Sequence, residues 1–438
     1  MSLAQAFSDE EVLQLRSTFP YFAHPTLVDG TAVAYLDSAA TSQRPLRVLD
    51  AEREFVSFHN AAVHRGTSNA VGAATTAFED AREAVAQLVN AAPSHTVVWA
   101  SGATDALNIL ALGIGEATLG ASAPALAVAG SERFVLQPGD EILVTEAEHH
   151  ANLVPWQRLA AKTGASLKYI PVDQNGVWGV DQARQALNSR TRVFAFTHVS
   201  NVTGQVSEVA ELVAAAAELT GGKAITVLDA CQSVPHIRVD LQELGVDFAA
   251  FSSHKMFGPN GTGALVGRTE LLDALPPART GGSAITRVTM EHTEFLPAPA
   301  RFEAGTPAVS QVVGFGEAAR MLQELDMDRV AATEHALVER LVDGLLALPK
   351  VKLIGPQSSD RVALTAIGVE GLHGHDLGQV LDVAGVLVRT GHHCAQPLHR
   401  AVGVPSSVRA SVHVTSTVDE VERFLAGVED ALRYFELV

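Results

Sequence analysis

Residues 192–232 read "RVFAFTHVSNVTGQVSEVAELVAAAAELTGGKAITVLDACQ", in which two apolar runs flank a run rich in Ala and Leu. The apolar runs, 192–201 and 224–232, are rich in β-branched and aromatic residues and predict buried strands. The run between them, 208–222, predicts a helix. A strand, a helix and a second strand in this order are typical of a parallel sheet that helices cover.

The same alternation continues on both sides of this stretch. The further predicted strands are 96–102, 141–150, 166–173, 247–255 and 263–268. Apolar strands that alternate with helices predict an α/β fold, in which a large domain has a mainly parallel sheet with helices on both faces. The Ala-, Gly- and Ser-rich segment 114–140 predicts a long loop or an insertion.

The pattern changes near residue 305, where long amphipathic stretches replace the alternation. Residues 312–348 and 417–435 have helical periodicity, and short strands lie between them. We therefore expect a second, smaller α+β domain at the C-terminal end of the chain. The predicted division gives the large domain residues 24–320, and the small domain residues 1–23 and 321–438.

The composition restricts the class of protein. The 438 residues include 31 Lys and Arg against 49 Asp and Glu, so the formal net charge is −18. Such an acidic chain repels phosphate backbones and anionic headgroups, which argues against nucleic acid and membrane as partners. No apolar stretch is long enough to span a bilayer.

The N-terminal residues predict a helix and no signal peptide. They lack a basic segment followed by a long apolar run. "SDEE" instead predicts a helix start, with Ser8 as the N-cap and Glu11 three residues on. Cys231 and Cys394 are the only cysteines, which is too few for a disulfide framework. We therefore expect a soluble protein in a reducing compartment, the cytoplasm.

Polar residues stand where several predicted strands end. In open α/β sheets, ligands bind at the edge formed by the carboxyl ends of the strands. Each of these residues alone could be a capping or loop residue, but together they predict a binding site. They are Thr104, His149, Asn201, Asp229, Gln232, His254 and Lys255.

Three of these positions suggest a particular chemistry. The glycine turn and helix start at 101–105 would offer free N–H groups to a phosphate, although an ordinary capped helix has the same pattern. Asp229 ends a buried strand and needs a cation, such as a protonated pyridine nitrogen or a structural partner. Lys255 follows a strand and precedes a Gly-rich loop, where a desolvated amine can form an imine. Together these features predict a pyridoxal 5′-phosphate site.

Several longer motifs resemble a known family. They are "YLDSAATSQRP" (35–45), "NAAVHRGTS" (60–68), "HHANLVPWQ" (149–157), "THVSNVTG" (197–204), "SSHKMFGPNGTG" (252–263), "RFEAGTP" (301–307), "RTGHHCAQP" (389–397) and "RAS" (409–411). The chain resembles the class V aminotransferase group of fold-type I pyridoxal phosphate enzymes, and within it the SUF-type (group II) cysteine desulfurases. The resemblance implies a homodimeric transferase that converts L-cysteine to L-alanine. It also implies sulfur delivery to a SufE- or SufU-type acceptor for iron–sulfur cluster assembly.

The resemblance also implies roles for individual residues. Lys255 would be the Schiff-base lysine, His149 would stack on the pyridine ring, Asp229 would hold the pyridine nitrogen, and Gln232 the phenolic oxygen. The implied phosphate ligands are Thr104, Ser252, His254 and, from a second subunit, Thr306. Asn201 and Arg409 would orient the substrate carboxylate, with Arg389 near them. Ala103 belongs to the cofactor-binding turn but stands where the family has Thr, so a hydroxyl donor is missing.

Cys394 lies within "RTGHHCAQP" (389–397) and would be the nucleophile that becomes a persulfide. A thiolate suits attack on sulfur because it is a soft nucleophile with a tunable pKa. Gly391 permits unusual backbone angles, and Pro397 is expected to stiffen the end of a mobile segment. The alternative for the His-His-Cys sequence is a metal site, but three adjacent residues rarely converge on one ion. We expect no metal.

Some features depart from the family, and other functions stay open. The segment 114–140 is longer than expected, Ala230 and Cys231 replace Gly-Ala, and the end of the chain lacks a Tyr-Asn pair after "RAS". A selenocysteine lyase, a cysteine sulfinate desulfinase, or an epimerase or transaminase would keep the same cofactor. A non-catalytic sulfur carrier is a third class, and it would not need Lys255.

Overall fold

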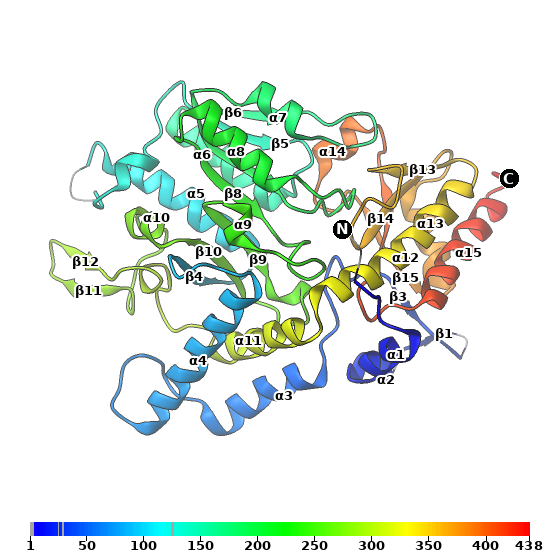
Figure 1. Ribbon diagram of the computed structural model, residues 1–438, viewed down its shortest axis with the longest axis horizontal. Helices are drawn as coiled ribbons and strands as arrows, with labels where there is room; N and C mark the ends of the chain where they lie inside the picture. The colour runs from blue at the N-terminus through cyan, green and yellow to red at the C-terminus, as the bar shows by residue number, and fades with distance from the viewer. Residues whose placement is uncertain (1–3, 25, 29, 124–126) are drawn as a thin grey trace.

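The computed structural model describes residues 4–24, 26–28, 30–123 and 127–438. Residues 1–3, 25, 29 and 124–126 lie outside the described residues; they belong to the predicted N-terminal segment, the large domain and the 114–140 segment. The chain forms a large α/β part and a smaller part in which the N- and C-terminal segments lie together (Figure 1).

A seven-stranded sheet forms the centre of the large part. Its order is β4-β10-β9-β8-β7-β5-β6, and only β10 runs antiparallel to its neighbours. The mainly parallel sheet is therefore confirmed, and each predicted strand overlaps one observed strand. The strands are β4 (His95–Ala100), β5 (Glu141–Thr145), β6 (Ser166–Ile170), β7 (Thr191–Thr197), β8 (Ile225–Asp229), β9 (Phe248–Ser252) and β10 (Gly263–Arg268).

Helices cover both faces of this sheet, because successive strand side chains point to opposite faces. On one face, Phe194 and Phe196 join a core with helices α4 (Asn69–Leu88), α8 (Val209–Thr220) and α11 (Val309–Glu324). On the other, Val193 and Ala195 join a core with α5 (Ala103–Gly120), α6 (Val154–Thr163) and α10 (Thr269–Ala274). The remaining elements are α3 (Leu46–Glu54), η1 (Phe55–His59), η3 (Ser131–Phe134), η4 (His150–Asn152), α7 (Val180–Ala186), α9 (Leu241–Leu244), η5 (Ser253–Lys255), η6 (Ala300–Phe302), and the hairpin β11 (Ile285–Val288) and β12 (Thr293–Phe295).

The prediction of a loop over 114–140 is wrong for its first part. Helix α5 continues to Gly120 because Ile114 and Ala117 bury their side chains in the second core. A short 3₁₀ helix, η3, follows at Ser131–Phe134. The small residues that suggested a loop therefore allow close packing of a helix against the sheet.

The smaller part is α+β, as predicted. An antiparallel sheet of order β13-β14-β17-β16 packs against three long helices. The predicted helical stretch 312–348 is two helices, because Asp326 adopts a φ of 62° between α11 and α12. The elements are α12 (Met327–Ala347), β13 (Val351–Ile354), β14 (Leu364–Val369), α13 (Gly374–Val383), β16 (Arg389–Gly391), α14 (Gln396–Ala401), β17 (Ser407–Ser411) and α15 (Val418–Tyr434).

The N-terminal residues join the smaller part. Helix α1 (Asp9–Ser17) begins at the predicted capping box of Ser8 and Glu11. Strand β3 (Ala34–Tyr35) pairs in parallel with β15 (Val386–Leu387). Two further strands, β1 (Leu27–Val28) and β2 (Thr31–Ala32), and helix α2 (Pro20–Ala23) lie nearby in the sequence. Among the described residues, no helix has the length and apolar character needed to cross a membrane.

Candidate active site

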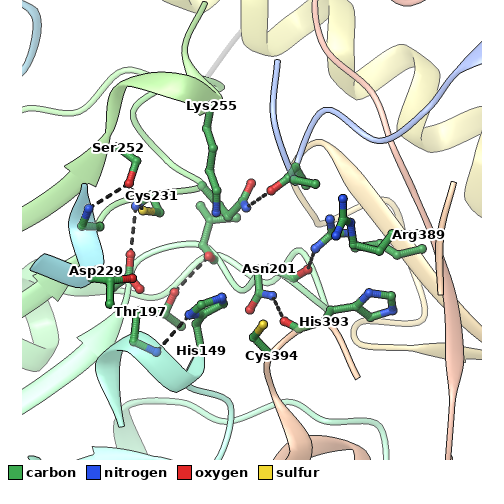
Figure 2. A pocket seen from close by; sticks show the side chains of 18 of the residues that line it. His149, Thr197, Asn201, Asp229, Cys231, Ser252, Lys255, Arg389, His393 and Cys394 are labelled. Carbon is green, nitrogen blue, oxygen red and sulfur yellow. Dashed lines mark hydrogen bonds between the residues drawn. The ribbon is translucent and has the colours of Figure 1, made fainter. Parts of the chain in front are cut away.

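A cavity of about 390 Å³ lies at the carboxyl ends of the sheet strands (Figure 2). It is lined by segments that follow β4, β7, β8 and β9 and by the segment that contains Cys394. All but one of the predicted site residues line it. They are Ala103, Thr104, His149, Asn201, Asp229, Gln232, Ser252, His254, Lys255, Arg389, Cys394 and Arg409.

The start of α5 forms one wall of the cavity. Gly102 adopts a φ of 149° and no side chain caps the helix. The Ala103 N–H donates to Ser252 Oγ at 2.8 Å. Ala103 has no hydroxyl, as expected, but its backbone N–H holds the Ser252 hydroxyl at the wall of the cavity. Strand β10 passes closely behind the turn, since a Cβ on Gly263 would lie 2.6 Å from Gly102 Cα. The geometry suits a phosphate, whose charge the helix dipole would favour.

Asp229 ends the buried strand β8 and lies at the opposite wall. Burial raises its pKa, while the Cys231 backbone N–H, which donates at 3.0 Å, and the charge of Lys255 act against that shift. Burial and the neighbouring Asp229 carboxylate raise the pKa of Cys231 to about 12, so this thiol stays protonated near neutral pH. Asp229 makes none of the ion pairs found among the described residues, and its carboxylate can accept a cationic N–H.

Lys255 and His149 face the same space. Lys255 closes the short 3₁₀ helix η5 directly after β9, and the backbone C=O of His254 accepts the Ser42 N–H at 2.9 Å. Burial, followed by the charge of Lys255, lowers the pKa of His149 to about 3. Its Nδ1 accepts the Ala151 N–H at 3.0 Å. His149 is therefore a neutral ring held in a fixed orientation, which suits stacking on an aromatic cofactor.

The Cys394 segment is held by hydrogen bonds from the large part. Asn201 Nδ2 donates to the His393 C=O at 2.7 Å, and the His150 N–H donates to the Cys394 C=O at 2.7 Å. The Gln396 N–H donates to His150 Nε2 at 3.1 Å. Figure 2 shows Cys394 approaching the cavity from a different segment than Lys255, with Asn201 between them.

The backbone of this segment is unusual at three of four consecutive positions, 391–394. Gly391 has a φ of 113°, as its predicted freedom allows, and His393 and Cys394 have φ values of 49° and 58°. Left-handed angles cost free energy for non-glycine residues. Pro397 does not simply stiffen a loop, because it lies in the first turn of α14, where proline is well tolerated. The predicted mobility of 389–397 stays a prediction.

Sequence reasoning gave no role to Asp37, which contacts both predicted substrate arginines. Its carboxylate accepts from Arg389 Nη2 at 2.8 Å and lies 3.5 Å from Arg409 Nη2. Arg409 also donates from Nη1 to the Asn201 C=O at 2.9 Å. Asp37 lies inside the motif "YLDSAATSQRP", but its partners are more than 350 residues away in the chain, so one sequence could not identify them.

Thr306 is the predicted site residue that the cavity does not include. It lies in a second cavity of about 1240 Å³, lined by residues 60–65 and by the segment between 283 and 311. In a single chain, Thr306 is therefore not placed with the other predicted phosphate ligands.

The expectation of no metal at the His-His-Cys sequence stays a prediction. Within the described ranges, the one group of side chains with metal-like spacing is His236, Glu334 and His413, and it does not include Cys394. His236 Nδ1 and Glu334 Oε2 are hydrogen-bonded at 2.9 Å.

The residues of the first cavity fit pyridoxal phosphate. The uncapped start of α5 and Ser252 would hold the phosphate, and the buried Asp229 carboxylate would accept the pyridine N–H. Gln232 Nε2 donates to the Ala39 C=O at 2.8 Å and retains a second N–H for the phenolic oxygen. Lys255 supplies the amine.

The family model for aminotransferase class-V matches residues 34–424. The chain belongs to the class V aminotransferase family. Members of this family are pyridoxal phosphate-dependent enzymes of fold type I, so the α/β architecture agrees with the family.

Relatives are similar to the chain over almost its whole length. It is 49% identical to the "Probable cysteine desulfurase 2" of Mycobacterium leprae, covering 96% of each chain. It is 39% identical to the "Probable cysteine desulfurase" of Streptomyces coelicolor, with 96% of this chain and 97% of the relative covered. A solved apo cysteine desulfurase from Thermococcus onnurineus superposes with a TM-score of 0.86 at 33% identity, covering 98% of this chain and 100% of that one.

Proposed function

We propose that the protein is a cysteine desulfurase that converts L-cysteine to L-alanine and keeps the sulfur as a persulfide on Cys394. The observation that carries this proposal is that Cys394 and Lys255 line one cavity, while Cys394 is also exposed to solvent. An exposed thiol beside the cofactor site can receive sulfur inside and pass it on outside. The similar proteins named cysteine desulfurases support the same activity.

The residues around the cofactor and the residues around the substrate carboxylate have different roles in the reaction. Bound pyridoxal phosphate supplies an electron sink next to the substrate Cα. Lys255 Nζ accepts and returns the Cα proton, and the neutral His149 ring covers the site of reaction. Arg409 binds the substrate carboxylate, and Asn201, which accepts from Arg409 and donates to the Cys394 segment, orients both groups.

Sulfur transfer then needs no outside oxidant. Cys394 Sγ, as the thiolate, attacks the substrate sulfur, so that an S–S bond forms and the substrate C–S bond breaks. The carbon fragment takes the bonding electron pair, is protonated and leaves as L-alanine. An acceptor protein of the SufE or SufU type takes the persulfide sulfur for iron–sulfur cluster assembly, in the cytoplasm, where thiols stay reduced.

The two cysteines allow a matched test. The wild type, Cys394→Ala and Cys231→Ala are given L-cysteine, and alanine, sulfide and the mass of the protein are measured. We expect Cys394→Ala to keep the cofactor but to lose alanine release and the persulfide mass, and Cys231→Ala to keep both. Alanine release by Cys394→Ala at the wild-type rate would contradict the proposal and favour a lyase acting on selenocysteine or cysteine sulfinate.

The proposed enzyme is a homodimer in which Thr306 reaches the phosphate of the partner subunit's cofactor. The support is the second cavity at Thr306, together with exposed apolar side chains such as Phe58 (80%) and Met290 (96%). Lys255→Ala and Thr306→Ala chains should each be impaired, and mixed dimers should regain one intact site. No recovery after confirmed subunit exchange would contradict shared sites.

The domain division at residues 24 and 320 is also a proposal. The pairing of β3 with β15 suggests that residues 34–37 would move with the smaller part, so limited proteolysis can test where the division lies.

A further inference from the structure

A buried serine lies between two histidines next to the Cys394 segment. Ser407 Oγ is 2.8 Å from His393 Nε2 and also 2.8 Å from His399 Nε2. Ser407 is 0% exposed, His399 1% and His393 7%. A hydroxyl and a neutral imidazole each have one polar proton to donate, so the partners of these groups decide where each proton lies.

His399 fixes the direction of this hydrogen-bonded chain. Its Nδ1 lies 2.9 Å from the Ala395 C=O, which can only accept, so the ring carries its proton on Nδ1. Burial lowers the pKa of His399, so the ring is neutral near neutral pH and its Nε2 has a lone pair. Ser407 therefore donates its O–H to His399 Nε2 and not to the Gly391 C=O, which is 3.4 Å away.

His393 then has the opposite tautomer. Because the proton of Ser407 is already used, its oxygen accepts from the His393 Nε2–H. Burial lowers the pKa of His393 to about 2, so this ring is also neutral. Its Nδ1 is buried without a partner among the described residues. In the part of the chain that the structure describes, the hydrogen bond of the His393 ring is therefore the one to Ser407.

The secondary structure fixes both supports of the His393 ring. Ser407 begins β17 and pairs in register with Gly391 on β16. His399 lies in α14, the helix that directly follows the Cys394 segment. The chain of three side chains thus connects a sheet strand and a helix to the residue before Cys394.

The backbone at His393 and Cys394 needs support, because both residues have left-handed angles, with φ values of 49° and 58°. Asn201 Nδ2 and the His150 N–H donate to their two C=O groups. These bonds hold the peptide groups, while the bond to Ser407 holds the His393 side chain. Backbone and side chain of His393 are therefore fixed from different parts of the molecule.

We propose that Ser407 and His399 are positioning residues, which hold the His393 ring and so keep Cys394 in the left-handed conformation that brings it to the cavity. This inference deepens the proposed function, on which it rests in assuming that Cys394 takes up sulfur there. Neither residue touches the substrate; both act through His393.

The first test observes the tautomers directly. Nitrogen NMR of the cofactor-loaded protein, isotopically labelled at its histidines, distinguishes ring nitrogens that carry a proton from those that do not. The variants His393→Gln and His399→Gln identify the two sets of signals. Near neutral pH we expect His393 to carry its proton on Nε2 and His399 on Nδ1. The same tautomer in both rings, or a charged His393, would overturn the proposal.

The second test shows whether the chain acts as a unit. Persulfide formation on Cys394 is followed by protein mass in a single turnover with L-cysteine. Ser407→Ala leaves the His393 Nε2–H without its acceptor and should slow this step about tenfold, while cofactor affinity stays unchanged. His399→Leu should slow it only about threefold, because Ser407 still accepts from His393.

The double variant Ser407→Ala/His399→Leu should be as slow as Ser407→Ala alone, because both substitutions act through the same ring. Effects that multiply in the double variant would overturn the proposal. If Ser407→Ala does not fold, the tautomers of the wild type decide the proposal by themselves.

A distant variant and the enzyme assay separate the possible failures. Ser122→Ala removes an exposed hydroxyl just after α5 and should leave persulfide formation unchanged. A wild type that has the expected tautomers but forms no persulfide on Cys394 would contradict only the proposed function. Persulfide formation that Ser407→Ala does not slow would contradict only the present inference.

Discussion

The cofactor end and the Cys394 end of the same cavity are held in different ways. Asp229, Ser252 and Lys255 follow neighbouring strands of one sheet, so buried backbone pairing fixes them. Cys394 is fixed by single hydrogen bonds between segments 192 to 246 residues apart, such as Asn201 to His393 and Gln396 to His150. Because the contacts of the two ends are separate, we expect substitutions around Cys394 to weaken sulfur transfer without changing cofactor binding.

The largest expected effect lies at the cofactor end. Lys255→Ala removes the amine that we propose accepts and returns the substrate proton, and L-alanine formation should fall by on the order of 10⁴-fold. Cys394 should still react with iodoacetamide at the wild-type rate, since none of its contacts involve Lys255. Borohydride reduction and peptide mapping of the wild type should place the pyridoxyl group on Lys255.

The exposed Lys223 provides the matched control, because Lys223→Ala should keep the wild-type rate. A pyridoxyl group on another lysine would contradict the assignment, and slower alkylation of Cys394 in Lys255→Ala would contradict the separation of the two ends.

Low pH should lower the free energy of unfolding of the protein, through buried histidines near both ends of the cavity. Burial is the largest cause that lowers the pKa of His149 to about 3, of His198 to about 4 and of His393 to about 2. Below about pH 6.5 these three histidines bind three protons in the unfolded chain that they do not bind in the folded chain, so their contribution makes stability fall as the pH falls. Glu148 opposes this with one proton, because burial raises its pKa to about 8. The net of about two protons from these four groups corresponds to roughly 2–3 kcal/mol per pH unit near pH 5.5.

Urea unfolding across that pH range measures the slope directly, and a slope of zero or of opposite sign would contradict this expectation. His393→Gln should lower the slope by about one proton, because it removes the titrating group of the Cys394 end. The same slope in this variant would show that His393 is not buried neutral.

The smallest effect concerns the Cys394 end alone. His150→Ala removes the acceptor of the Gln396 N–H, at a cost of about 1 kcal/mol, so sulfur transfer should slow by about five- to tenfold. Cofactor affinity and the dissociation constant of L-alanine should not change. His150→Gln, whose amide oxygen can accept the same N–H, should recover part of the rate, whereas an equal loss in both variants would point to a packing effect.

The same contrast explains what could be predicted from the sequence. The seven strands and their polar ends were predicted because burial imposes a local pattern on each strand. The predicted 141–150 strand ends at Thr145, since the polar residues after it leave the sheet to form the site. The antiparallel direction of β10 could not be predicted, because an apolar run does not encode the direction in which it pairs.

The substrate end was only partly predictable, for a different reason. Arg389 and Arg409 were found through the family resemblance, but the contact of both with Asp37 depends on β3 joining the smaller part. Likewise, "HHANLVPWQ" drew attention to His149, while the role of His150 requires knowing where Gln396 lies. Long-range contacts of this kind leave no periodic pattern in one sequence.

The pairing of residues 34–37 with the C-terminal sheet sets an order of events during synthesis. The strands from β4 to β10, and with them the cofactor end, emerge from the ribosome before the C-terminal segments of the smaller part are made. Asp37, although made early, has its partner Arg409 372 residues later. At typical translation rates that interval is roughly 20–75 s. A nascent chain can therefore build the cofactor end well before the proposed carboxylate site at Arg409 exists, which would delay the proposed chemistry until the polypeptide is nearly finished.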